Sequence, residues 1–108
     1  MVYLHGGAWA VGDLDSHEAH ARRIANRTGA VVVNVDYRLA PEHPFPAGHD
    51  DAVTALAWAT AHSAELGGAA EAIGVAGDSA GGNLALAAAL ASVEQGLPLR
   101  AALLLYAV

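Results

Sequence analysis

The stretch from Gly74 to Asn83 (GVAGDSAGGN) limits what this chain can fold into more than any other. A short apolar run, residues 72–76, leads into a turn framed by glycines, and an alanine-rich segment, residues 84–92, leads out of it. This pattern predicts a strand, a tight turn and a helix. The pentapeptide GDSAG at its centre fits G-x-S-x-G, a turn that holds a serine in a strained backbone conformation with its hydroxyl exposed.

The glycines of this turn have a steric reason. Gly77 and Gly81 stand two residues before and two after Ser79, and a Cβ at either place would crowd the neighbouring strand or helix. Ser79 is also predicted to lie at a helix N-terminus, where free N–H groups and the helix dipole favour a developing oxyanion. A glycine turn with a serine N-cap is a common helix start, so the pentapeptide alone leaves a purely structural interpretation open.

Length, charge and cysteine content narrow the possible functions. The 108 residues are enough for one small domain, and 55% of them are hydrophobic, which predicts elements buried on more than one side. The formal net charge of −6 argues against nucleic acid or an anionic membrane surface as a partner. The sequence has no cysteine, which excludes disulfides, thiolate catalysis and cysteine-based zinc sites.

The sequence also bears on where the protein works. Residues 1–5 (MVYLH) have neither the basic region nor the apolar run of a signal peptide. Charged residues or glycines interrupt every apolar run before it reaches about 18 residues, so no membrane span is expected. We therefore predict a cytoplasmic protein, although a truncated N-terminus would have lost any signal.

The whole chain alternates between strand and helix patterns. Strands are predicted at residues 2–5, 30–36, 72–76 and 101–108, and helices at residues 16–28, 47–66 and 84–92. The strands at 30–36 and 101–108 are almost continuously apolar, which is typical of strands covered on both faces. The predicted fold is therefore α/β, with a four-stranded, mostly parallel sheet in the order β-α-β-α-β-α-β and helices on both faces. The strands at 30–36 and 101–108 are expected to form its two edges.

Several local patterns have a structural and a functional interpretation. The first helix is expected to start at an Asp15 N-cap and to end at Gly29. The segment His17–His20 (HEAH) has the wrong spacing for the H-E-x-x-H zinc motif, so we assign it to a solvated helix face. We expect no metal site and no cofactor. An ion pair between Arg38 and Glu42 is predicted to hold the proline-rich loop.

Two adjacent glycines follow the first predicted strand. Gly6 and Gly7 can present backbone N–H groups without side-chain cover, which is the geometry that an oxyanion hole needs. The alternative is a simple turn in which His5 is a hydrogen-bonded structural histidine. The glycine pair alone does not decide between the two.

Three segments together resemble the hormone-sensitive-lipase-like esterases of the α/β-hydrolase fold. Residues 5–9 (HGGAW) look like that family's HGG oxyanion loop, and residues 77–83 (GDSAGGN) look like its nucleophile elbow. Residues 36–42 (DYRLAPE), followed by 44–47 (PFPA), look like the DYRLAPE…PFPA segment that lies between them. All three occur in the family's order.

The resemblance implies a serine carboxylic-ester hydrolase that acts on a small-molecule ester through an acyl-enzyme. Ser79 would be the nucleophile, and the N–H groups of Gly6, Gly7 and Ala80 would form the oxyanion hole. His5 would support the oxyanion loop rather than act as the base. The remaining elbow positions would be Gly77, Asp78 and Gly81. The family often has a third glycine where this chain has Ala8. We expect this change to be tolerated; its cost would be a narrower acyl side of the pocket.

The resemblance also implies groups that these residues do not contain. In this fold the catalytic triad runs serine, then acid, then histidine along the chain. All six histidines precede Ser79, and the only acid after it is Glu94, on the helix that follows the serine. We therefore expect residues 1–108 to be the central fragment of a catalytic domain, without its N-terminal cap and first strands or its C-terminal Asp and His, and to be inactive alone. The oligomeric state is left open.

Two other functions compete with the hydrolase. A non-catalytic relative would use the same pocket to bind a small ligand, but a binding protein has no need of a strained serine. A structural domain with a chance motif would have to match all three family segments in order.

Overall fold

The computed structural model describes residues 1–97 and 99–108. Strands and helices alternate as predicted, and a short 3₁₀ helix, η1, precedes the third strand. The elements are β1 (Val2–Leu4), α1 (Leu14–Thr28), β2 (Val33–Val35), α2 (Ala47–Ala61), η1 (Ala70–Ala72), β3 (Gly74–Asp78), α3 (Ala80–Glu94) and β4 (Ala101–Leu105).

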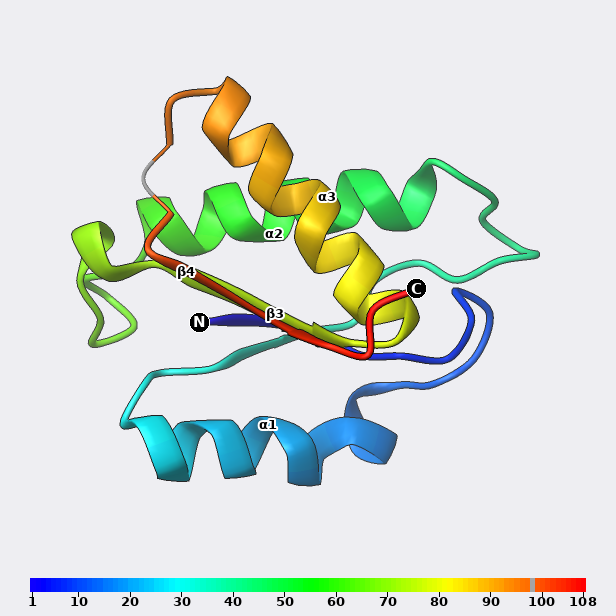
Figure 1. Ribbon diagram of the computed structural model, residues 1–108, viewed down its shortest axis with the longest axis horizontal. Coiled ribbons are helices and arrows are strands. Elements are labelled where there is room, and N and C mark those ends of the chain that lie inside the picture. The colour runs from blue at the N-terminus through cyan, green and yellow to red at the C-terminus, as the bar shows by residue number, and fades with distance from the viewer. Residues whose placement is uncertain (98) are drawn as a thin grey trace.

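The four strands form one sheet in the order β2-β1-β3-β4, and every neighbouring pair is parallel. Helix α1 covers one face, and α2 and α3 cover the other (Figure 1). The α/β fold and the parallel sheet are therefore confirmed. In the register of β1 and β3, Leu4 lies opposite Gly77. The chain segments that leave these two central strands consequently start side by side, at the carboxyl end of the sheet.

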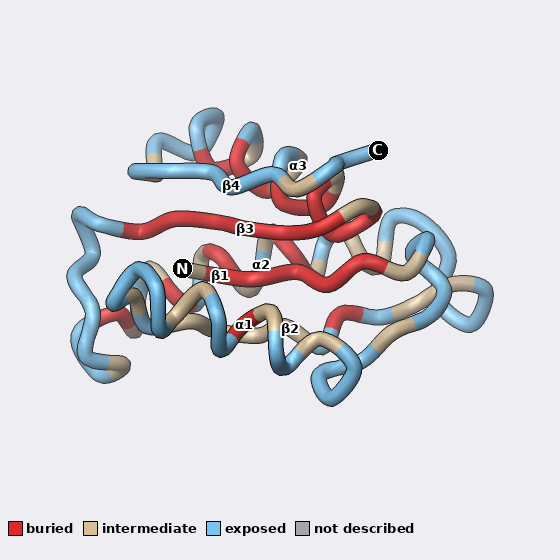
Figure 2. Tube along the Cα trace, turned by 60° about the horizontal axis from the view of Figure 1, so that its bottom comes forward, coloured by how far each residue is buried: buried red, intermediate tan, exposed pale blue. Residues whose placement is uncertain are grey.

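The core lies around the two central strands. Because side chains alternate along a strand, Val2 and Leu4 of β1 pack under α2 and α3, together with Leu56 and Leu84. Tyr3 points to the opposite face and packs near α1. All residues of β1 and β3 are buried, as Figure 2 shows in red.

The boundaries of the helices differ from the prediction. Helix α1 begins at Leu14, and its N-cap is Asp13 rather than Asp15. The Asp13 carboxylate accepts a hydrogen bond from the Ser16 N–H at 2.7 Å, and the Ser16 hydroxyl accepts one from the Asp13 N–H at 3.0 Å. This reciprocal pair meets the same need as the predicted Asp15 cap, so the start moves by two residues. The prediction that Gly29 ends the helix is confirmed, with φ +72°.

The other two helices also change length. Helix α2 ends at Ala61, before the predicted Leu66, and α3 extends beyond the predicted 84–92 at both ends. In the described part of the chain, no helix is long and apolar enough to cross a membrane.

The edge strands are less buried than their sequences suggest. Only Val33–Val35 of the predicted 30–36 segment is a strand, and it is half-buried. Strand β4 is exposed along nearly its whole length. A strand at 101–108 is expected to be buried on both faces only in a complete sheet, and here it forms an open edge. Each of the two has one neighbouring strand, and they are the predicted edges of the sheet.

The ion pair of Arg38 involves a partner that the sequence prediction missed. The Arg38 guanidinium contacts Asp51 at 2.8 Å, and the Arg38 backbone N–H donates to the same carboxylate at 2.8 Å. The predicted pair with Glu42 is therefore wrong. Asp51 lies near the start of α2, which packs beside this loop, whereas Glu42 is close only in sequence.

Candidate active site

Ser79 lies in the turn between β3 and α3, as the sequence predicts. Its backbone has φ +52° and ψ −120°, a combination that non-glycine residues rarely adopt. A Cβ on Gly77 would overlap the backbone of Gly81. A Cβ on Gly81 would overlap the carbonyl oxygens of Leu4 and His5. The steric reason given for both glycines is thus confirmed, because the turn presses against the end of β1.

The backbone of Ser79 is held firmly while its side chain is left free. Its N–H donates to the Leu105 carbonyl at 2.9 Å, and its own carbonyl accepts from the Asn83 N–H at 3.1 Å. The hydroxyl does not cap α3. Within residues 1–97 and 99–108 it forms no hydrogen bond to another side chain. The turn therefore presents an unoccupied hydroxyl at the N-terminus of a helix.

The glycine loop after β1 lies directly against this turn. A Cβ built on Gly6 would be 3.2 Å from the Cβ of Ser79. The next two residues have positive φ angles, +130° at Gly7 and +52° at Ala8. The Gly7 carbonyl accepts hydrogen bonds from the N–H groups of Ala10 and Val11 at 3.0 and 2.9 Å. These bonds fold the loop into a compact turn beside the serine.

The amides of this loop differ in whether they are occupied. The Gly6 N–H donates to Asp78 Oδ1 at 3.1 Å, so the predicted contribution of Gly6 to an oxyanion hole does not agree with this geometry. No described residue accepts a hydrogen bond from the N–H of Gly7, Ala8 or Ala80. Sequence reasoning missed the amide of Ala8. The available signal was its position directly after the two glycines.

His5 is fully buried under this loop. Its Nδ1 lies 2.8 Å from the Gly6 carbonyl, and its ring stacks on Tyr37 with centroids 4.4 Å apart. The Tyr37 hydroxyl donates to the His5 carbonyl at 2.6 Å. Burial, with a smaller effect of the negative charge of Asp78, raises the pKa of Tyr37 to about 12. These contacts fit the supporting role that the sequence suggests for His5.

Asp78 is the other buried polar residue of the elbow. Its Oδ1 accepts a 2.5 Å hydrogen bond from the Tyr3 hydroxyl. Burial first, and then this bond to Asp78, raise the pKa of Tyr3 far above its usual range. His17 Nε2 lies 3.5 Å from Asp78 Oδ2, so the assignment of His17 to a solvated helix face is wrong. Sequence patterns gave no signal for Tyr3, which reads only as a strand residue.

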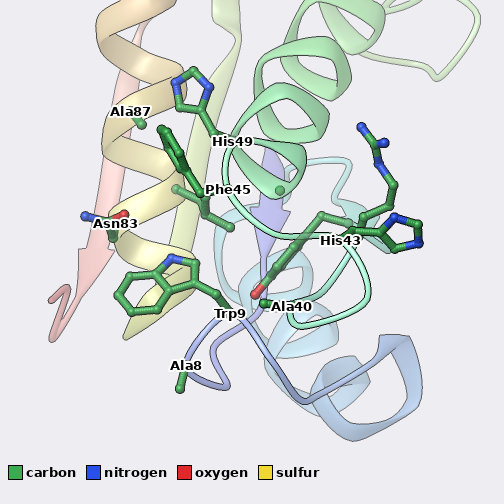
Figure 3. Close-up of a pocket in the computed structure, with 12 residues that line it drawn as sticks. Ala8, Trp9, Ala40, His43, Phe45, His49, Asn83 and Ala87 are labelled. Atoms are coloured by element: carbon green, nitrogen blue, oxygen red, sulfur yellow. The ribbon is translucent and has the colours of Figure 1, made fainter.

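A cavity of about 410 Å³ opens beside the glycine loop and helix α3. Asn83 and Ala87 of α3 face it on one side, and Trp9 of the glycine loop faces it on another (Figure 3). Phe45 and His49 come from the proline-rich loop and the start of α2. Asn83 follows Ser79 by one helical turn, so the cavity reaches the vicinity of the serine. Its wall is mostly aromatic and apolar.

The described residues contain no group of three or more metal-ligating side chains. In the same part of the chain, no histidine forms a hydrogen bond with Ser79. Each of the six histidines precedes the serine in sequence. In the described residues the arrangement therefore combines a serine hydroxyl and backbone amides that have no partner, and no histidine lies in hydrogen-bond contact with that serine.

Comparison with known proteins agrees with this geometry. The model of a family with the α/β hydrolase fold matches residues 1–108. A carboxylesterase of Mycobacterium tuberculosis, NlhH, is 55% identical over 107 residues, which are 98% of this chain and 34% of that protein. Hormone-sensitive lipase of Homo sapiens is 41% identical over 97 residues, 90% of this chain and 9% of its own length.

Solved structures give the same result. The hyperthermophilic esterase from Pyrobaculum calidifontis superposes with a TM-score of 0.95 and is 47% identical. That match covers 98% of this chain and 35% of the esterase. The chain thus spans about a third of the length of NlhH, the carboxylesterase described above. It belongs to the α/β hydrolase fold family, among the relatives of hormone-sensitive lipase and the mycobacterial carboxylesterases.

Proposed function

We propose that this chain supplies the nucleophile and the oxyanion hole of a serine carboxylic-ester hydrolase. The observation that carries the proposal is the strained Ser79. Among the described residues its hydroxyl has no hydrogen-bond partner, and it lies against a loop whose Gly7 and Ala8 amides have none either. The relatives that are named carboxylesterases support the same reaction class.

The reaction starts when Ser79 Oγ attacks the carbonyl carbon of the ester. The carbonyl oxygen becomes negatively charged in the tetrahedral intermediate, and the N–H groups of Gly7, Ala8 and Ala80 stabilise it. Collapse of the intermediate releases the alcohol and leaves an acyl group on Ser79, which water then removes. Donors of this kind are fixed before the reaction, and losing one typically slows catalysis by about 10²- to 10³-fold.

The choice of Gly7 and Ala8 over Gly6 follows from hydrogen-bond occupancy. The Gly6 N–H already donates to Asp78, and that bond ties the loop to the elbow. Gly7 and Ala8 adopt positive φ angles that turn their amides away from the path of a regular strand. Ala80 is the first residue of α3, where an amide has no partner within the helix.

Proton transfer requires groups from outside residues 1–108. A serine hydroxyl is a weak nucleophile until an adjacent base takes its proton. We place the acid and the base of the triad in a longer protein of which these residues are the central part. The length of the relatives, of which this chain covers about a third, supports that placement.

The cavity beside Asn83 supports a small ester as the substrate. Its volume of about 410 Å³ and its wall of Trp9 and Phe45 suit an apolar group of modest size. A ligand pocket of this kind is typically a few hundred Å³ and mostly apolar.

The test is hydrolysis of p-nitrophenyl esters by the full-length protein. We expect Ser79→Ala to lower kcat by about 10⁶-fold. Ser92→Ala, which removes a hydroxyl on the far part of the same helix, serves as the matched control and keeps its activity. The competing interpretation is a non-catalytic protein that binds small ligands. It predicts no turnover in the unmodified protein and unchanged ligand binding after Ser79→Ala.

A further inference from the structure

The G-x-S-x-G pattern assigns no role to Asp78, yet this side chain is buried and well connected. Its Oδ1 accepts hydrogen bonds from the Tyr3 hydroxyl at 2.5 Å and from the Gly6 N–H at 3.1 Å. Asp78 is the residue before the nucleophile, and Gly6 is the first residue of the glycine loop. One carboxylate oxygen therefore links the two segments that have to meet for ester hydrolysis.

The second oxygen of this carboxylate, Oδ2, faces an imidazole nitrogen. His17 Nε2 lies 3.5 Å from Asp78 Oδ2, and the two side chains are 19% and 6% exposed. No arginine or lysine in the described residues comes within 4.0 Å of Asp78. The contact is at the long limit of a hydrogen bond, and it is the only polar contact to Oδ2 among the described residues. A buried polar group without such a partner is disfavoured.

The start of α1 holds the His17 ring in this position. His17 Nδ1 lies 2.9 Å from the Ser16 hydroxyl, which belongs to the capping pair with Asp13. The opposite nitrogen then points at Asp78. Two further imidazoles flank the ring, His5 with its centroid at 5.2 Å and His20 at 5.4 Å.

We propose that His17 is a positioning residue for the oxyanion loop. Its contact with Asp78 Oδ2 orients the carboxylate so that Oδ1 faces the Gly6 N–H, and this bond holds the loop against Ser79. The role in catalysis rests on the proposed function, since it matters only if the loop binds an oxyanion. Without His17, Oδ2 has no donor among the described residues, the bond to Gly6 weakens, and the amides of Gly7 and Ala8 move.

Kinetics of the full-length protein test this role. His17→Phe keeps a ring but removes the nitrogen, and we expect kcat to fall by about 10- to 100-fold with KM nearly unchanged, because small misplacements of catalytic groups have effects of this size. His17→Gln restores a donor and recovers part of kcat. His20→Phe is the matched control, because His20 lies on the same helix and has no contact with Asp78 among the ion pairs described, so it leaves both constants unchanged.

A second readout does not depend on turnover. In protein labelled with ¹⁵N-glycine, the Gly6 amide proton carries the signature of a hydrogen bond to a carboxylate. We expect its resonance to shift upfield in His17→Phe and in Asp78→Asn, and not in His20→Phe. If His17→Phe does not fold, His17→Gln and the Gly6 resonance carry the test.

The outcomes separate this inference from the proposed function. Loss of activity in Ser79→Ala together with full activity and an unmoved Gly6 resonance in His17→Phe overturns the role of His17 alone. Equal activity in Ser79→Ala and the unmodified protein overturns the hydrolase, and the Gly6 resonance still decides whether His17 holds the loop.

Discussion

The central strands and the two edge strands of the sheet are all rich in apolar residues, but they differ in how far they are buried. Strands β1 and β3 are fully buried, whereas β2 is half-buried and β4 is mostly exposed (Figure 2). All four strands consist largely of apolar residues. The difference shows that an apolar run predicts a strand, while its burial depends on which elements lie beside it. Ser79 and the glycine loop of the candidate site directly follow the two central strands.

The same contrast appears in the turns that follow the strands. Ser79 and the glycine loop leave neighbouring buried strands, and Gly77 and Gly81 stand where a Cβ would overlap neighbouring backbone. At the periphery a Cβ would meet nothing within 4 Å at Gly29, and only an ordinary contact at 3.5 Å from the Ser63 carbonyl oxygen at Gly68. Changes at the centre should therefore affect folding and activity far more than chemically identical changes at the periphery.

The sharpest form of the comparison replaces one glycine in each region. Gly81→Ala is expected to destabilise the protein by about 3 kcal/mol or more, because the new Cβ would overlap the backbone at the end of β1. Gly68→Ala is expected to change stability by less than about 0.5 kcal/mol, since its nearest neighbour would be an ordinary contact. Urea unfolding of the full-length protein measures both, and equal costs would contradict the contrast.

A pair of leucines tests burial in the strands themselves. Leu4→Ala, at a position with no exposed surface, should cost about 2–5 kcal/mol of folding free energy. Leu104→Ala, at a position that is 37% exposed, should cost clearly less. Thermal melting compares the two variants. A similar cost for both would mean that another segment of the full-length protein covers β4.

Tyr37 gives the central region a dependence on alkaline pH. Its folded-state pKa of about 12 exceeds the unfolded value of about 10. The folded protein therefore keeps this proton where the unfolded chain loses it, so stability is fully present below pH 10 and falls as pH rises towards 12. Tyr37→Phe should flatten that decline and remove the bond to His5, at a cost of about 1 kcal/mol at neutral pH. Melting curves between pH 8 and 12 measure how the stability of each protein changes with pH. The same decline in Tyr37→Phe and in the unmodified protein would contradict this role of Tyr37.

The smallest expected effect lies in the exposed proline-rich loop. Arg38→Gln removes the ion pair with Asp51 and should cost about 0.5 kcal/mol, because exposed pairs contribute little. Glu42→Gln is the control and should leave stability unchanged. A larger cost for Glu42→Gln would restore the pair that the sequence suggested.

The sequence predicted those features that depend on neighbouring residues. The strained turn at Ser79 with Gly77, and the helix end at Gly29, follow from local backbone sterics. Gly81 was predicted from the motif, although its crowding comes from the end of β1. The features it missed depend on residues far apart in the chain. Arg38 binds Asp51 because α2 packs beside the loop, and His17 faces Asp78 because α1 lies across β1 and β3. Residue spacing along the chain therefore predicts neither the Arg38–Asp51 contact nor the His17–Asp78 contact.

The different occupancy of the Gly6 and Gly7 amides has the same origin. Gly6 and Gly7 looked equivalent in sequence, but the parallel register of β1 and β3 brings Gly6 against the Asp78 carboxylate. Its amide is used there, which leaves the amides of Gly7 and Ala8. Which of these N–H groups is free depends on how two strands pair, so local sequence patterns do not determine it.

The most direct test is to treat the full-length protein with a phosphonate ester that reacts with activated serines and to map the adduct by peptide mass spectrometry. The account predicts one adduct, on the peptide that contains Ser79, and its loss in Ser79→Ala. An adduct on another serine, or an unmodified Ser79 in protein that hydrolyses esters, would contradict it.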